Sequence, residues 1–231
     1  VMDVIQASRD CASGPLAAAE HYPRERWTRW THHEYSVGGQ LVETRVYHRI
    51  PASPSGIGFE GEDYNATRFG YDSVGRQNRE VSPGGTITRT VLDAQGRVTG
   101  RWVGIDDTGA TDADPAGGGA AGNNMKLVKA LEYDDGNPGG NGNLTQVTRP
   151  VDDTSGNNRV VEYSYDFRDR LELTSADDGT RTILTENTYD NLDRITQVET
   201  FHTATTSGNR LSRRKTHYDD LNRVYRSETY S

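Results

Sequence analysis

A short unit built around a tyrosine and a tight turn recurs along this chain of 231 residues. In each copy a tyrosine, or once a leucine, is followed by Asp or Ser, a turn and a return strand. A chain that reuses one short unit is usually specified for architecture, because each unit completes its packing only against its neighbours. The copies begin 21 to 41 residues apart, at Tyr35, Tyr71, Leu92, Tyr133, Tyr165, Tyr189 and Tyr218.

The turn in each copy follows a backbone requirement. Residues 72–75 and 93–96 have Asp in the first place, where its carboxylate accepts backbone N–H bonds, and Gly in the fourth, where a left-handed backbone is needed. Three other copies have Asp or Asn in the fourth place, the non-glycine residues that best tolerate positive φ. An Arg follows each of these turns and a strand resumes. The predicted structural turn residues are Asp72, Gly75, Arg76, Asp93, Gly96, Arg97, Asp166, Arg170, Asp190, Arg194, Asp219 and Arg223.

Two copies depart from this form. The copy that starts at Ser36 keeps a turn but has neither the Asp nor the Arg. The copy after Tyr133 is stretched through residues 135–141 before its strand resumes. Loop closure entropy grows only slowly with length, so we interpret both as the same hairpin with a relaxed or enlarged tip.

Composition favours a thin sheet over a thick two-layer core. Only 32% of the residues are hydrophobic and the mean hydropathy is −0.84, yet 12 Tyr and 3 Trp recur among alternating, β-branched neighbours. That pattern is typical of half-buried strands and unlike a disordered chain. We therefore predict a wall of sheet, wetted on at least one face, in which Arg pairs with Asp and Glu and stacks on Tyr.

Net charge limits the partners. At −8 the chain lacks the concentrated positive patch that nucleic acid or an anionic membrane rewards, so we expect no nucleic acid partner. No stretch approaches the length of a membrane-spanning helix and no signal peptide is visible, so we expect no membrane insertion.

The chain divides into two zones on this reading. Residues 1–30 are expected to be irregular, with a possible short helix over residues 15–20. Residues 31–231 are expected to form the β array of repeats, interrupted by a Gly/Asp-rich loop at 104–124. Loops this long inside an ordered array are uncommon and are often functional or disordered.

The Gly/Asp-rich loop carries the one weak metal candidate. Hard cations such as calcium take several oxygen ligands from a flexible loop, although this spacing does not fit the EF-hand pattern. A plain polar surface loop is the alternative. The candidate calcium ligands are Asp106, Asp107, Asp112 and Asp114.

Enzymatic motifs are absent from the sequence. His32 and His33 lie on alternate faces of an expected strand and show no metal-ligand spacing, while Cys11 has no visible base partner. We predict no enzyme activity, no catalytic residue and no cofactor. A binding module for carbohydrate or protein is the alternative function, with Trp27, Trp30 and Trp102 stacking on a ligand.

The segments 71–76, 189–195 and 218–224 resemble the YD repeat, the YDxxGR(L/V) unit of the bacterial Rhs family. The same repeat occurs in the teneurin shell and in the cocoon-forming components of insecticidal Tc toxins. The similarity covers about residues 31–231, and five copies keep turn, Arg and strand together. The resemblance implies an all-β fold: an array of antiparallel hairpins in a curved or spiral sheet that forms part of a shell.

The resemblance also implies a function. It indicates a structural segment of a large bacterial shell-forming or cell-surface protein, located outside the cell or at its surface. The expected partners are the remainder of the same polypeptide or neighbouring subunits, with an enclosed toxin domain or a surface glycan as further candidates. Asp114-Pro115-Ala116-Gly117 lacks the Leu and the surroundings of the family's Asp-Pro-x-Gly-Leu motif, so self-cleavage is not expected here. We interpret the chain as part of a longer protein.

Overall fold

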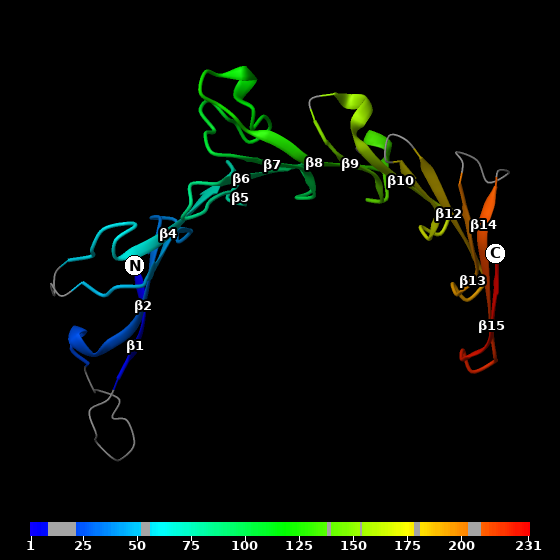
Figure 1. Ribbon diagram of the computed structural model, residues 1–231, viewed down its shortest axis with the longest axis horizontal. Coiled ribbons are helices and arrows are strands. Elements are labelled where there is room, and N and C mark those ends of the chain that lie inside the picture. The colour runs from blue at the N-terminus through cyan, green and yellow to red at the C-terminus, as the bar shows by residue number, and fades with distance from the viewer. Residues whose placement is uncertain (9–21, 52–55, 138–139, 153, 178–180, 203–208) are drawn as a thin grey trace, which may run out of the picture. The chain divides into compact units, whose positions relative to one another are not determined.

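Figure 1 shows the computed structural model of the chain. It describes residues 1–8, 22–51, 56–137, 140–152, 154–177, 181–202 and 209–231. Among these residues no helix is long and apolar enough to span a membrane. The expected short helix over residues 15–20 lies outside the described residues, and so does Cys11.

The described chain is built almost entirely of strands. Its helical pieces are four 3₁₀ turns, η1 (Arg24–Arg26), η2 (Gly117–Gly119), η3 (Asp134–Gly136) and η4 (Ser155–Asn157). The strands are β1 (Met2–Ala7), β2 (Trp27–Tyr35), β3 (Leu41–Tyr47), β4 (Tyr64–Tyr71), β5 (Gln77–Val81), β6 (Ile87–Leu92), β7 (Val98–Gly104), β8 (Lys126–Tyr133), β9 (Leu144–Arg149), β10 (Arg159–Tyr165), β11 (Leu171–Asp177), β12 (Thr182–Tyr189), β13 (Ile195–Phe201), β14 (Arg210–Tyr218) and β15 (Val224–Tyr230).

The hydrogen-bonded order of the strands is their order in the sequence, in one sheet of fifteen. Each strand pairs antiparallel with the next, as β10 does with β11 and β12 with β13. Neighbours in sequence can pair this way because a short turn suffices to reverse the chain. The predicted all-β array of antiparallel hairpins is confirmed.

The chain forms two compact units. The first comprises Val1–Leu92 and Trp102–Lys126, and the second comprises Asp93–Arg101 and Leu127–Ser231. In an antiparallel meander, alternate connections lie at opposite ends of the strands. In the second unit the turns after Tyr165, Tyr189 and Tyr218 therefore share one end, which Figure 1 shows for β12 to β15.

The N-terminal zone differs from the sequence prediction. Residues 2–7 and 27–30, expected to be irregular, are strands: Met2–Ala7 is β1, and β2 already begins at Trp27. The two strands pair in antiparallel register, with Ile5 opposite Trp30. The pairing joins residues about 25 apart along the chain, so no local turn signal marks it.

A small aromatic core lies in the first unit. Trp30, Tyr47, Tyr64 and Ala66 are buried together, with the rings of Trp30 and Tyr47 stacked at 3.8 Å between centroids. Elsewhere single apolar side chains such as Val147, Leu184 and Phe201 are buried at separate points along the sheet. The core is thin, as the low hydrophobic fraction predicts.

Candidate functional site

The repeated turn is held by one carboxylate. Asp166 Oδ1 accepts the backbone N–H groups of Arg168 at 2.8 Å and Arg170 at 3.1 Å, while Oδ2 accepts the Nε–H of Arg170 at 2.7 Å. The backbone N–H of Asp169 also donates to the carbonyl of Asp166 at 3.0 Å. A single Asp thus satisfies two backbone donors and fixes the Arg that starts the return strand.

The same contacts recur in the four other regular copies. In each, the first Asp accepts the backbone N–H groups two and four residues later and the Nε–H of the Arg, at 2.6 to 3.1 Å. These pairs are Asp72 with Arg76, Asp93 with Arg97, Asp190 with Arg194 and Asp219 with Arg223.

The fourth turn residue adopts the predicted left-handed backbone. Gly75 and Gly96 have φ values of 90° and 85°, and Asp169, Asp193 and Asn222 lie between 59° and 63°. Next to each turn the strand register shifts, as between Ser164 and Tyr165. A turn followed by a left-handed residue and a bulge is one of the common hairpin connections, and it matches the right-handed strand twist.

The tyrosine of each copy is bound to the copy before it. Tyr189 donates its hydroxyl to the carbonyl of Leu171 at 2.7 Å, and Leu171 begins the return strand of the preceding hairpin. The equivalent contacts join Tyr71 to Leu41, Tyr165 to Leu144 and Tyr218 to Ile195, at 2.7 to 3.0 Å. The repeated tyrosine is therefore a junction between hairpins and lies outside the turn itself.

The repeated arginine makes the other half of this junction. The guanidinium of Arg170 lies over the ring of Tyr189, and its Nη1 donates to Asp193 Oδ1 at 2.7 Å. Arg194 in turn covers the ring of Tyr218 and donates to Asn222 Oδ1 at 3.1 Å. The fourth turn residue thus has a second function that backbone reasoning missed, because it accepts a hydrogen bond from the preceding copy.

The stretched copy keeps this junction with different residues. Arg97 covers Tyr133 and donates to Asp134 Oδ2 at 3.0 Å. In the place of the missing Arg, Asn143 donates its side-chain N–H to Asp169 Oδ1 at 2.8 Å. The two copies that lack an Asp–Arg pair in the turn therefore differ, since in the Ser36 copy Gln40 Nε2 reaches the carbonyl of Gly75 at 3.3 Å.

One turn of this kind escaped the sequence analysis. Between β5 and β6, Gly85 has φ of 80° and its N–H donates to the carbonyl of Ser82, whose Oγ accepts the N–H of Thr86 at 3.1 Å. It has no tyrosine and no arginine, so a search for Tyr-Asp pairs passes over it. The only signal was Pro83-Gly84 in a turn-forming run.

Hydrogen bonding keeps the turn carboxylates ionised. The side chain of Arg170, helped by two backbone N–H groups and opposed by partial desolvation, lowers the pKa of Asp166 to about 2. At Asp219 the backbone N–H and then the side chain of Arg223 likewise lower the pKa. The carboxylates therefore act as fixed acceptors at neutral pH.

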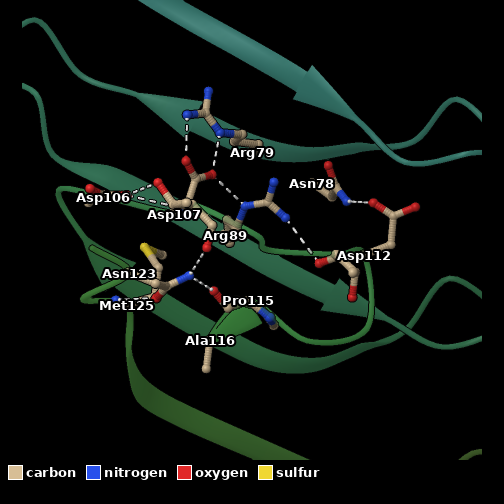
Figure 2. A network of polar contacts seen from close by, with 12 residues as sticks. Asn78, Arg79, Arg89, Asp106, Asp107, Asp112, Pro115, Ala116, Asn123 and Met125 are labelled. Carbon is tan, nitrogen blue, oxygen red and sulfur yellow. Dashed lines mark hydrogen bonds and ion pairs between the residues drawn. The ribbon is translucent and has the colours of Figure 1, made fainter. Parts of the chain in front are cut away.

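The Gly/Asp-rich loop packs on β5 and β6 of its own unit. Figure 2 shows the carboxylate of Asp107 between two arginines: Arg79 Nε donates to it at 2.6 Å and Arg89 Nε at 2.7 Å. These two hydrogen bonds, the one from Arg79 foremost, lower the pKa of Asp107 to about 2 against partial desolvation. The loop is held to the sheet by a fork of two cations on one anion.

Further contacts close the loop. Asp112 accepts Asn78 Nδ2 at 2.8 Å and the backbone N–H of Ser73 at 3.1 Å. Asn123 Nδ2 donates to the carbonyl of Pro115 at 3.0 Å, and Pro115 is fully buried beneath the loop (Figure 2). Arg79, Arg89 and Asn78 were not singled out from the sequence, because nothing local shows which strand residues a distant loop contacts.

The four candidate calcium ligands are separately engaged. Asp106 accepts the N–H and hydroxyl of Thr108, and Asp114 accepts the N–H groups of Ala116 and Gly118. Asp107 and Asp112 bind the strand residues described above. In the part of the chain that the structure describes, no three His, Cys, Asp or Glu side chains group as metal ligands. The geometry gives the calcium hypothesis no support.

The three tryptophans are not a common exposed surface. Trp30 is 4% exposed, stacks on Tyr47 and donates its indole N–H to Asp3 Oδ1 at 2.8 Å, so its expected exposure is wrong. Trp27 is half-buried with its edge against Trp30, and Trp102 is half-buried on β7. Trp30 faces inward because β1, which the sequence analysis left irregular, covers it.

The adjacent histidines have separate partners. His32 Nδ1 lies 2.8 Å from Asp3 Oδ1, and His33 Nδ1 lies 3.1 Å from Thr44 Oγ1. They point to different neighbours because successive side chains of a strand alternate between its faces.

The chain is similar in fold to solved components of Tc toxins. No protein-family profile matches it, and no curated protein does. The TcdB2-TccC3 structure aligns with a TM-score of 0.55 at 16% identity over 86% of this chain and 10% of that chain. TcdB2-TccC3 without its hypervariable C-terminal region gives 0.55 at 17% identity, and the Photorhabdus luminescens Tc holotoxin pore gives 0.55 at 16%. The chain spans about a tenth of the length of these chains, and at this identity the likeness shows the fold.

Proposed function

We propose that this chain is a structural YD-repeat segment of a large bacterial shell-forming or cell-surface protein, and that it is not catalytic. The observation that carries the proposal is the junction between copies. The repeated Tyr, Arg and Asp side chains contact the neighbouring hairpin, as Tyr189, Arg170 and Asp193 do. Residues that repeat in order to bind each other serve the wall.

Magnitudes support this assignment. A tyrosine hydrogen bond contributes about 1 kcal/mol, an exposed cation–π pair about 0.5–1 kcal/mol, and a partly exposed ion pair up to about 1 kcal/mol. One junction such as that of Arg170 with Tyr189 and Asp193 therefore contributes about 2–3 kcal/mol. Stabilisation of that size at each junction suits a repeat array, in which each unit depends on its nearest neighbours.

The fold likeness supports the shell. The similar solved structures are components of Tc toxin assemblies, and this chain aligns with about a tenth of each. We therefore propose one stretch of a longer wall, located outside the cell or at its surface. Its partners are the rest of the same polypeptide or neighbouring subunits. An enclosed toxin domain is the proposed cargo of the parent protein.

Electron microscopy of the full-length parent protein tests the proposal. We expect strands that adjoin this segment on the sheet and continue it into a larger wall around a cavity. A segment that instead sits as a separate module on a tether, with no adjoining strands, would overturn it. Turnover of a glycosidase or peptidase substrate by the purified chain, abolished by a single substitution, would overturn the non-catalytic assignment.

A further inference from the structure

The last hairpin presents a junction with nothing on it. In the second unit the arginines of three earlier junctions are covered by the tyrosine of the next copy: their side chains are 24%, 18% and 20% exposed at Arg97, Arg170 and Arg194. Arg223 has the same contacts to its own turn, from Nε to Asp219 Oδ2 at 2.9 Å, yet its side chain is 72% exposed.

The backbone acceptor of the junction is repeated there too. The first residue of the return strand gives its carbonyl to the next tyrosine at Leu41, Leu144, Leu171 and Ile195. Val224 occupies this place in the last copy. Its side chain is 57% exposed, and in the described residues no tyrosine hydroxyl reaches its carbonyl.

We propose that the free edge of β15 is a docking surface for an antiparallel strand that ends in a tyrosine followed by an Asp-led turn. This deepens the function proposed above and rests on it. The tyrosine ring covers Arg223 and its hydroxyl donates to the carbonyl of Val224. An Asp or Asn in the fourth turn position accepts the free Nη–H of Arg223. The occupant is thus defined by the three groups that the earlier junctions supply.

The edge is built against other strands. Free edges attract any extended segment unless charges interrupt them. Along β15, Arg226 Nε donates to Glu228 at 2.6 Å, and Tyr230 donates to the same carboxylate. A strand that brings no partner for Arg223 would cover charged groups without compensation. The other edge strand, β1, contains no tyrosine, so a second copy of this chain docked through β1 does not supply the junction.

A tethered hairpin tests the proposal on the whole chain. A second copy of residues 182–200, which carries Tyr189, Asp190 and Asp193, is appended after Ser231 through a short Gly/Ser linker. Tethering raises its effective concentration to the millimolar range, which compensates for the marginal stability of an isolated hairpin. Amide hydrogen exchange of Val224–Tyr230 is measured with and without the appended segment.

We expect the β15 amides that point to the free edge to exchange about tenfold more slowly or slower in the extended chain. Protection should fall when Arg223→Ala is introduced, or when the appended tyrosine is replaced by Ala. It should persist with Arg159→Ala, a matched loss of an exposed arginine on β10.

Two results would overturn the inference. Either the β15 exchange rates are the same with and without the appended hairpin, or protection is equal with the tyrosine-less hairpin, which would mean that the edge accepts any strand. Neither result touches the electron-microscopy test of the wall, which depends on the parent protein, so the two failures are distinguishable.

Discussion

The guanidinium carbon of Arg170 lies 4.6 Å from the ring centroid of Tyr189, the tyrosine of the next hairpin. The same guanidinium is bound to Asp166 behind it and to Asp193 ahead of it. One side chain therefore connects its own turn to the next, and the array is continuous because this connection is repeated.

The ring and the hydroxyl of Tyr189 can be separated by mutation. Tyr189→Phe removes only the bond to Leu171 and should lower the free energy of unfolding by about 1 kcal/mol. Tyr189→Ala also removes the ring under Arg170 and should lower it by about 2–3 kcal/mol. Urea unfolding followed by tyrosine and tryptophan fluorescence measures both. Tyr225→Phe, on a ring 66% exposed, is the control and should have almost no effect.

The turn carboxylate should act locally. Asp190→Ala removes the acceptor of two backbone N–H groups and of Arg194, which should cost about 1–2 kcal/mol. Hydrogen exchange should accelerate in β12 and β13 and at the junction with Tyr218. Amides around Asp72 should be unchanged, and acceleration there would contradict a nearest-neighbour array.

The left-handed position of Gly75 predicts a graded response. Gly75→Val should cost about 1–2 kcal/mol or more, because a β-branched residue is strained at a φ of 90°. Gly75→Asn should cost much less, since Asn222 adopts positive φ in the equivalent place. Equal losses, measured by thermal or urea unfolding, would mean that a contact with Gln40 and not the backbone sets the cost.

Acid should weaken the loop anchor. The pKa of Asp107 is lowered from 3.8 to about 2, so the unfolded state takes up a proton at higher pH than the folded state does. The stabilisation is thus complete above about pH 4 and is lost as the pH falls towards about 2. The urea midpoint should fall over that range, and Asp107→Asn should make the fall shallower. Asp220→Asn, on an exposed turn tip, should leave its slope unchanged.

Calcium titration addresses the Gly/Asp-rich loop. Asp107 is occupied by Arg79 and Arg89, and the other three carboxylates bind N–H and hydroxyl donors. We expect no saturable heat in isothermal titration up to millimolar calcium. A saturable signal that disappears in Asp112→Asn would contradict this expectation and restore the loop as a cation site.

The sequence by itself determined the hairpin. An Asp that caps two backbone N–H groups, a residue at positive φ and an Arg four places on all act within five residues, so the pattern from Asp72 to Arg76 predicts the local geometry. Strand order followed, because short turns pair neighbours. The turn at Ser82 was missed because the search was tied to tyrosine.

Only the tertiary structure decided what the repeated side chains touch. Arg170 meets Tyr189 and Asp193 about twenty residues away, and Arg79 and Arg89 meet Asp107 across a loop. Trp30 is buried because β1 pairs with β2 over a separation that carries no turn signal. Local patterns fix backbone conformation because their energies are short-ranged, whereas these contacts depend on strand register and on how far each loop folds back.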